Sequence, residues 1–136
     1  HFMNENVLDI AIKAKKASLK SDFYKCHTGC VAVYAGHIIA EGWNSEKTHS
    51  IQTYYNKFRD FDPSKYDGCI HAEMMVVQKI KYLDIDFSRV KIYVSRGKDM
   101  PMKAKPCKAC ENALRDLGIK KVNYTGDNSY IYERYV

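Results

Sequence analysis

The chain has no apolar run that approaches the roughly 20 residues needed to cross a bilayer, so the sequence does not predict a membrane protein. It also has no secretory signal, no internal repeat and no low-complexity linker, and a length of 136 residues suits one hydrophobic core. We therefore expect residues 1–136 to form a single domain. His1 and Phe2 precede the first methionine and are interpreted as a remnant of expression.

A disulfide framework is not expected either. The chain has five cysteines, an odd number, and two of them have the spacing of metal ligands. Free thiols suit a reduced, cytoplasmic setting, which is where we expect the protein to act.

Positive charge is in excess but unevenly spread. The net charge is +6, and residues 89–121 hold ten Lys and Arg against three Asp and Glu. The excess therefore surrounds the second of the two motifs described below. Two interpretations stay open: a solvated charged face, or a binding surface for a phosphate-bearing partner.

Apolar periodicity predicts the order helix, strand, strand, helix, strand, helix, strand, strand. Helices are expected at 4–20, 71–83 and 107–117, and strands at 30–34, 37–41, 90–95, 120–124 and 130–135. Residues 43–70 are expected to form a long connection. This order predicts an α/β domain with one sheet flanked by helices.

Two motifs contain residues suited to metal chemistry: His71-Ala72-Glu73 and Pro106-Cys107-Lys108-Ala109-Cys110. Cysteines three apart at a helix start share one face, and the exposed N–H groups there favour the thiolate form. His71, Cys107 and Cys110 would supply three zinc ligands and leave the fourth position open, as in catalytic sites. The combination H-x-E with P-C-x-x-C is typical of zinc-dependent nucleobase deaminases. The alternative is a structural zinc or unrelated cysteines.

Four segments, one of which extends the first motif, are similar to segments of one protein family. They are Thr28-Gly29-Cys30-Val31-Ala32-Val33, Gly42-Trp43-Asn44, Cys69-Ile70-His71-Ala72-Glu73 and Leu117-Gly118-Ile119-Lys120-Lys121-Val122. Through them the chain resembles the cytidine/deoxycytidylate deaminase superfamily, and its motifs are most similar to those of deoxycytidylate deaminases. The resemblance implies a three-layer cytidine-deaminase-like fold with a mixed five-stranded sheet. The end of the chain differs from deoxycytidylate deaminases in being expected to form a β-hairpin.

The resemblance also implies roles for individual residues. Zn²⁺ held by the three ligands would activate water, and Glu73 would move protons between that water and the base. Four residues are expected to contact substrate: Asn44 at the sugar, the Ala72 backbone at the base edge, Thr28 in the pocket strand, and Ser95. For Asn44 and Ser95, the alternatives are a turn residue and a polar strand end. Residues 96–105 form an insertion between Ser95 and Pro106, and its last residue, Lys105, stands where the family has Glu.

Two other groups of residues leave alternatives open. A second, structural zinc could draw on Cys26, His27, Cys30, His49 and Cys69, but no pair has a recognised ligand spacing. Aromatic residues gather in the long connection: Tyr54, Tyr55, Phe58, Phe61 and Tyr66, with Arg59 among them. They favour packing or contact between subunits of a homo-oligomer, and the alternative is stacking on bases of single-stranded nucleic acid.

The sequence thus favours a zinc-dependent hydrolase that deaminates a cytosine nucleoside or nucleotide, with deoxycytidine monophosphate (dCMP) as the favoured substrate. The second hypothesis is a deaminase acting on cytosine or adenine within single-stranded DNA or RNA. The third is a non-catalytic, metal-stabilised binding module, which would not require Glu73.

Overall fold

The computed structural model describes residues 2–23, 26–59, 68–97, 104–126 and 131–136. It shows one mixed sheet of five strands in the order β2-β1-β3-β4-β5. The strands are β1 (Thr28–Tyr34), β2 (His37–Trp43), β3 (Lys91–Arg96), β4 (Lys121–Thr125) and β5 (Ile131–Tyr135). β3 and β4 are parallel, whereas the other neighbours are antiparallel. The predicted α/β class is confirmed, and β4 and β5 form the expected C-terminal antiparallel pair.

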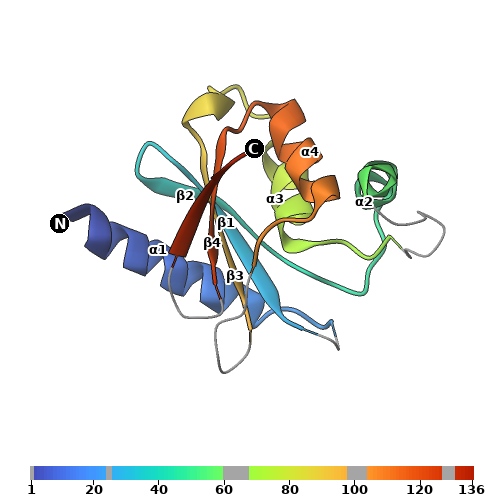
Figure 1. Ribbon diagram of the computed structural model, residues 1–136, viewed down its shortest axis with the longest axis horizontal. Coiled ribbons are helices and arrows are strands. Elements are labelled where there is room, and N and C mark those ends of the chain that lie inside the picture. The colour runs from blue at the N-terminus through green and yellow to red at the C-terminus, as the bar shows by residue number, and fades with distance from the viewer. Residues whose placement is uncertain (1, 24–25, 60–67, 98–103, 127–130) are drawn as a thin grey trace.

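One face of the sheet is covered by α1 (Phe2–Ser18), as Figure 1 shows. Its buried stripe includes Ala14 and Ala17, and Ala14 packs with Val31 and Tyr93 of the sheet. The helix lies close to the sheet because β1 has a glycine at the contact. A Cβ atom at Gly29 would lie 2.0 Å from the Ala14 carbonyl oxygen. The amphipathic pattern in the sequence therefore identified this layer correctly.

The opposite face is covered by α3 (Ala72–Ile80) and α4 (Lys108–Leu117), which lie together in Figure 1. Their buried side chains, among them Met74, Ile80 and Leu114, form the larger part of the core with β1, β3 and β4. The first turn of α3 approaches β2 at Gly42, where a Cβ atom would lie 2.5 Å from the Ala72 carbonyl oxygen. This close approach fixes the N-terminus of α3 against the sheet.

The segment expected to be a connection contains two short helices, α2 (Ser50–Tyr55) and the 3₁₀ turn η1 (Asn56–Phe58). The His49 side chain begins α2, because its Nδ1 accepts a hydrogen bond from the Ile51 N–H at 3.1 Å. A further 3₁₀ turn, η3 (Phe87–Arg89), precedes β3. Phe61, Tyr66 and most of the insertion at 96–105 lie outside the described residues. Within the described part of the chain, no helix has the length and apolar character needed to cross a membrane.

Candidate metal centre and active-site cavity

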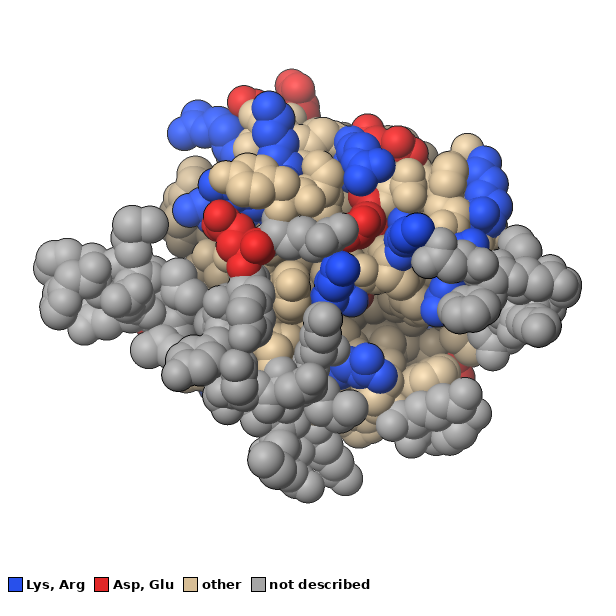
Figure 2. All heavy atoms as spheres, in the orientation of Figure 1, with Lys and Arg blue, Asp and Glu red and all other residues tan. Residues whose placement is uncertain are grey.

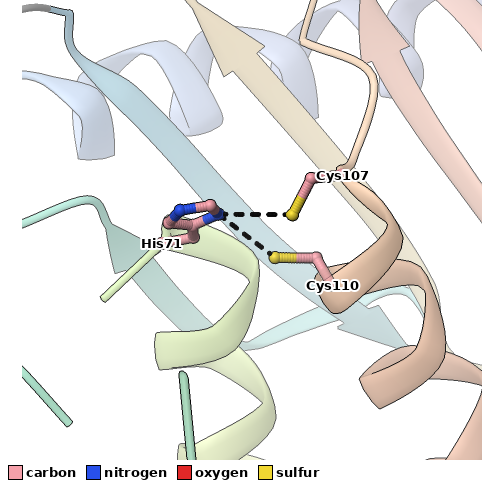
Figure 3. A group of neighbouring side chains, drawn as sticks. All are labelled: His71, Cys107 and Cys110. Atoms are coloured by element: carbon pink, nitrogen blue, oxygen red, sulfur yellow. Dashed lines mark hydrogen bonds between the residues drawn. The ribbon is translucent and has the colours of Figure 1, made fainter. Parts of the chain in front are cut away.

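Two helix N-termini meet at the metal motif. His71 is the N-cap residue of α3 and Cys107 is the N-cap residue of α4, and both have extended backbone angles. Cys110 lies in the first turn of α4 and is fully buried. Figure 3 shows the imidazole of His71 pointing between the two thiols. The convergence predicted from the spacing of the motifs is therefore present in the fold.

The three donor atoms have the geometry of a zinc site. His71 Nδ1 lies 3.6 Å from Cys107 Sγ and 3.5 Å from Cys110 Sγ, and all three donors lie within 4.8 Å of one another. A tetrahedral ion with Zn–S of about 2.3 Å and Zn–N of about 2.0–2.1 Å would separate nitrogen from sulfur by about 3.6 Å. One imidazole and two thiols are also the donor set that zinc favours. The site therefore fits zinc in both distance and chemistry.

The two thiols differ in acidity. A hydrogen bond from Cys110 lowers the pKa of Cys107 to about 3, with a further contribution from His71. The same hydrogen bond, together with burial, raises the pKa of Cys110 well above its ordinary value. The protein groups alone thus favour one thiolate at this site. A divalent cation held by His71, Cys107 and Cys110 would supply the positive charge needed for the second thiol to ionise.

Glu73 follows the zinc ligand His71 by two residues and lies in the first turn of α3. It is 5% exposed and lines the cavity described below. Burial raises the pKa of its carboxyl group, and the neighbouring His71 partly opposes that rise. Among the described residues, the group of side chains close enough to share one ion contains the three ligands and not Glu73. Its carboxylate therefore lies outside the group of metal donors, and its role in proton transfer stays a prediction.

A cavity of about 480 Å³ opens beside the metal centre. His71, Cys107 and Glu73 lie in its wall, and so do the predicted contacts Thr28, Asn44 and Ala72. The wall also contains three cationic residues that were not among the four predicted substrate contacts: Arg59, Arg96 and Lys105. Glu73 is the only carboxylate among the described lining residues. The described part of the cavity wall therefore has more cationic than anionic side chains.

Two of the predicted substrate contacts differ in position: Asn44 lines the cavity, whereas Ser95 is not among the described lining residues. The Asn44 amide oxygen accepts hydrogen bonds from Ser21 Oγ at 2.6 Å and from the Thr28 N–H at 2.9 Å. Its amide nitrogen donates to the Cys26 carbonyl oxygen at 2.9 Å, so Asn44 fastens the chain before β1 to the end of β2. Ser95 is 4% exposed and is not among the described residues that line the cavity. The substrate roles of both residues stay predictions.

Sequence reasoning missed an amide pair at the same cavity. Gln52 of α2 is fully buried, and its Oε1 accepts a hydrogen bond from the His71 backbone N–H at 3.0 Å. Its Nε2 donates to Asn56 Oδ1 at 2.8 Å, and Asn56 lines the cavity. The spacing of four residues between Gln52 and Asn56 could have indicated a helical pair, had α2 been recognised.

The residues considered for a second zinc do not come together within the described part of the chain. His49 caps α2 and its Nε2 contacts Gln78 at 2.7 Å, while the Cys69 thiol donates to the Glu46 carbonyl oxygen at 3.3 Å. The only group of three or more potential metal donors in that part of the chain is His71, Cys107 and Cys110.

Comparisons with known proteins identify a matching family and several similar structures. The family model described as "Cytidine and deoxycytidylate deaminase zinc-binding region" matches residues 3–125. The apo dCMP deaminase of cyanophage S-TIM5 is similar in structure, with a TM-score of 0.65 and 22% identity over 90% of this chain and 83% of that chain. The cytidine deaminase of Burkholderia pseudomallei has a TM-score of 0.66 and 19% identity over 94% of this chain and 91% of the other.

The S-TIM5 enzyme in complex with dCMP and dUMP is also similar, with a TM-score of 0.57 and 21% identity over 91% of this chain and 81% of that one. At these identities the likeness establishes the fold. No curated protein sequence matches the chain.

Proposed function

Because this chain belongs to the cytidine and deoxycytidylate deaminase zinc-binding family, we propose that it hydrolyses the amino group of a cytosine nucleotide, with dCMP as the favoured substrate. The general activity follows from the family and the metal centre: the chain is a zinc-dependent deaminase of the cytidine/dCMP type. The observation that supports a cytosine nucleotide as the substrate is the cavity wall, which combines Glu73 beside the zinc ligands with three cationic side chains.

His71, Cys107 and Cys110 would hold the zinc ion, with Glu73 beside it. When bound, zinc acts as a Lewis acid that lowers the pKa of water from about 15.7 toward about 7. Glu73 takes a proton from the attacking water and returns protons to the ring nitrogen and the leaving amine. Water adds at C4, the bond between C4 and the amino nitrogen breaks, and ammonia and the uracil product leave. The enclosed position of Glu73 keeps the proton within the site between these steps.

The remaining lining residues would orient the substrate. The Ala72 N–H lies at the first position of α3, where helix N–H groups have no partner within the helix, so it can donate to the base edge. Thr28 stands at the start of β1 in the same wall. Asn44 would contact the sugar. Its hydrogen bonds with Ser21 and Cys26 hold the side chain in one position, which suits a substrate contact.

Charge supports a nucleotide over a nucleoside. Zinc with two thiolates is formally neutral, so among the lining residues that the structure describes the cations Arg59, Arg96 and Lys105 exceed the anion Glu73 by two charges. A phosphate monoester carries nearly two negative charges at neutral pH. Binding energy from a phosphate distant from the reacting carbon can also be used to position the base.

A second candidate is deamination within single-stranded nucleic acid. Tyr54 and Phe58 are 57% and 38% exposed, and Lys57 Nζ lies 3.8 Å and 5.1 Å from their ring centroids. This surface adjoins Asn56 and Arg59, which line the cavity, and exposed rings beside cations can stack on bases. On the face shown in Figure 2, however, Lys and Arg are interspersed with Asp and Glu rather than forming one basic surface. The same exposed rings would serve equally as a contact within a homo-oligomer.

Ammonia release by the zinc-loaded protein distinguishes these candidates. The substrates would be dCMP, deoxycytidine and a cytosine-containing single-stranded DNA oligonucleotide. We expect dCMP to have the highest kcat/KM. Equal values for dCMP and deoxycytidine would refute the phosphate preference, and turnover of the oligonucleotide alone, falling steeply with added salt, would establish the second candidate.

A further inference from the structure

A buried amide pair connects the zinc ligand to the cavity wall. Gln52 in α2 is fully buried, and Asn56 at the start of η1 is 4% exposed. Gln52 Oε1 accepts from the His71 backbone N–H, and Gln52 Nε2 donates to Asn56 Oδ1. The pair therefore runs from the backbone of a metal ligand to a residue that lines the substrate cavity.

The orientation of both amides follows from hydrogen-bond chemistry. A backbone N–H can only donate, so the Gln52 atom facing His71 must be the oxygen. The Gln52 nitrogen must then face Asn56, and a nitrogen donor requires an acceptor, so Asn56 presents its oxygen to Gln52. The Asn56 amide nitrogen is left on the other side. Rotating either amide by half a turn would place two donors or two acceptors against each other.

That nitrogen is a donor available to a ligand. Among the described residues, Asn56 Nδ2 has no hydrogen-bond partner, and Asn56 lines the cavity. Arg96, which also lines the cavity, has a buried Nε with no partner among the same residues. The two donors come from different elements, η1 and β3. Buried donors are normally paired, so Arg96 Nε is suited to an oxygen acceptor of a bound substrate, and Asn56 Nδ2 is a second donor at the same cavity.

The charge around Asn56 identifies the acceptor. Arg59 is the C-cap residue of η1, its N–H donates to the Asn56 carbonyl oxygen at 3.0 Å, and both residues line the cavity. The base edge has its own donor in the Ala72 N–H at the start of α3. We propose that the Asn56 amide group donates to the 5′-phosphate of the substrate, so that Asn56 determines specificity for a nucleotide over a nucleoside. Gln52 is the positioning residue that keeps the amide turned toward the cavity.

This inference rests on the proposed function, and the test separates the two. Asn56→Asp preserves the shape of the side chain and an oxygen for Gln52, but it replaces the donor with an anion. Asn123→Asp is the matched control, because Asn123 lies on β4 and is not among the described cavity residues. The measurement is kcat/KM for dCMP and for deoxycytidine in the wild type and both variants, at equal zinc content and with the thermal midpoint recorded.

We expect Asn56→Asp to lower the ratio of kcat/KM for dCMP to that for deoxycytidine by about 10- to 150-fold, the range for a lost hydrogen bond to a charged group. Asn123→Asp should leave that ratio within a factor of about two. A wild-type ratio near one refutes the nucleotide preference itself. A high wild-type ratio that Asn56→Asp leaves unchanged overturns the role of Asn56 alone.

Two further measurements test the role of Asn56 if Asn56→Asp folds poorly or if deoxycytidine is not turned over. Asn56→Ser, which removes the amide without adding charge, should reduce the same ratio by a smaller factor. Calorimetric binding of dUMP and deoxyuridine gives the preference without turnover, and Asn56→Asp should weaken binding of dUMP alone. Equal weakening of both products would place the Asn56 amide at the base or sugar and would overturn the phosphate assignment.

Discussion

The substitution Gln52→Met tests the link between α2 and the metal centre. Met has nearly the length of Gln, so little cavity forms, but two hydrogen bonds are lost in a fully buried position. The His71 N–H and the Asn56 Oδ1 atom are left without their partner. A buried polar group without a partner costs about 1–3 kcal/mol, so the two together predict a loss of about 2–6 kcal/mol. That is a large part of the roughly 5–15 kcal/mol that stabilises a typical domain.

The assay is urea unfolding of the wild type and Gln52→Met at saturating zinc. Gln78→Met is the control, because Gln78 is exposed and His49 is its only side-chain hydrogen-bond partner among the described residues. We expect the control to change the free energy of unfolding by less than about 1 kcal/mol. If Gln52→Met is no more destabilising than Gln78→Met, the reasoning about the buried amide pair is wrong.

Three other changes have defined outcomes. Gly42→Ala places a Cβ atom 2.5 Å from the Ala72 carbonyl oxygen, so it should displace the start of α3, lower the thermal midpoint and weaken zinc binding in a chelator competition. Cys110→Ser removes a zinc ligand, so metal analysis should find well under one zinc per chain after dialysis. The Tyr55 hydroxyl contacts Asp116 at 2.8 Å, and burial, followed by that contact, raises the pKa of Tyr55 to about 12. Because that pKa is raised, the advantage of wild type over Tyr55→Phe should be constant below pH 10 and disappear toward pH 12 in urea unfolding; an unchanged advantage at high pH would contradict this.

The metal ligands could be predicted from sequence because the physics is local. A Cys-x-x-Cys pair at a helix start and a His before an amphipathic run both place donors at helix N-termini, where few arrangements are open. His71 and Cys107 prove to be N-cap residues rather than the first helical residues, a shift of one position. The glycine at position 42 belonged to a recognised motif, but its use, the close approach of α3, depends on a contact with a distant segment.

The helix α2 could not be predicted by the same reasoning. Its six residues are too few to show apolar periodicity, and its one fully buried side chain is polar. Gln52 can be buried only because the N–H of His71, 19 residues later, gives it a partner. Asn44 illustrates the same limit, since its amide oxygen is used by Ser21, which no motif connected to it. Partnerships between distant polar groups are set by the assembled fold rather than by local pattern.

The most direct test of the whole account is ammonia release from dCMP by the zinc-loaded wild type and by Glu73→Gln. The amide has the size of the carboxylate but cannot accept and return the proton, and Glu73 is not among the grouped metal donors. The account predicts turnover by the wild type and a loss of at least about 100-fold in kcat for Glu73→Gln at unchanged zinc content. Similar rates for the two proteins, or no turnover of any cytosine substrate by the zinc-loaded wild type, would contradict it.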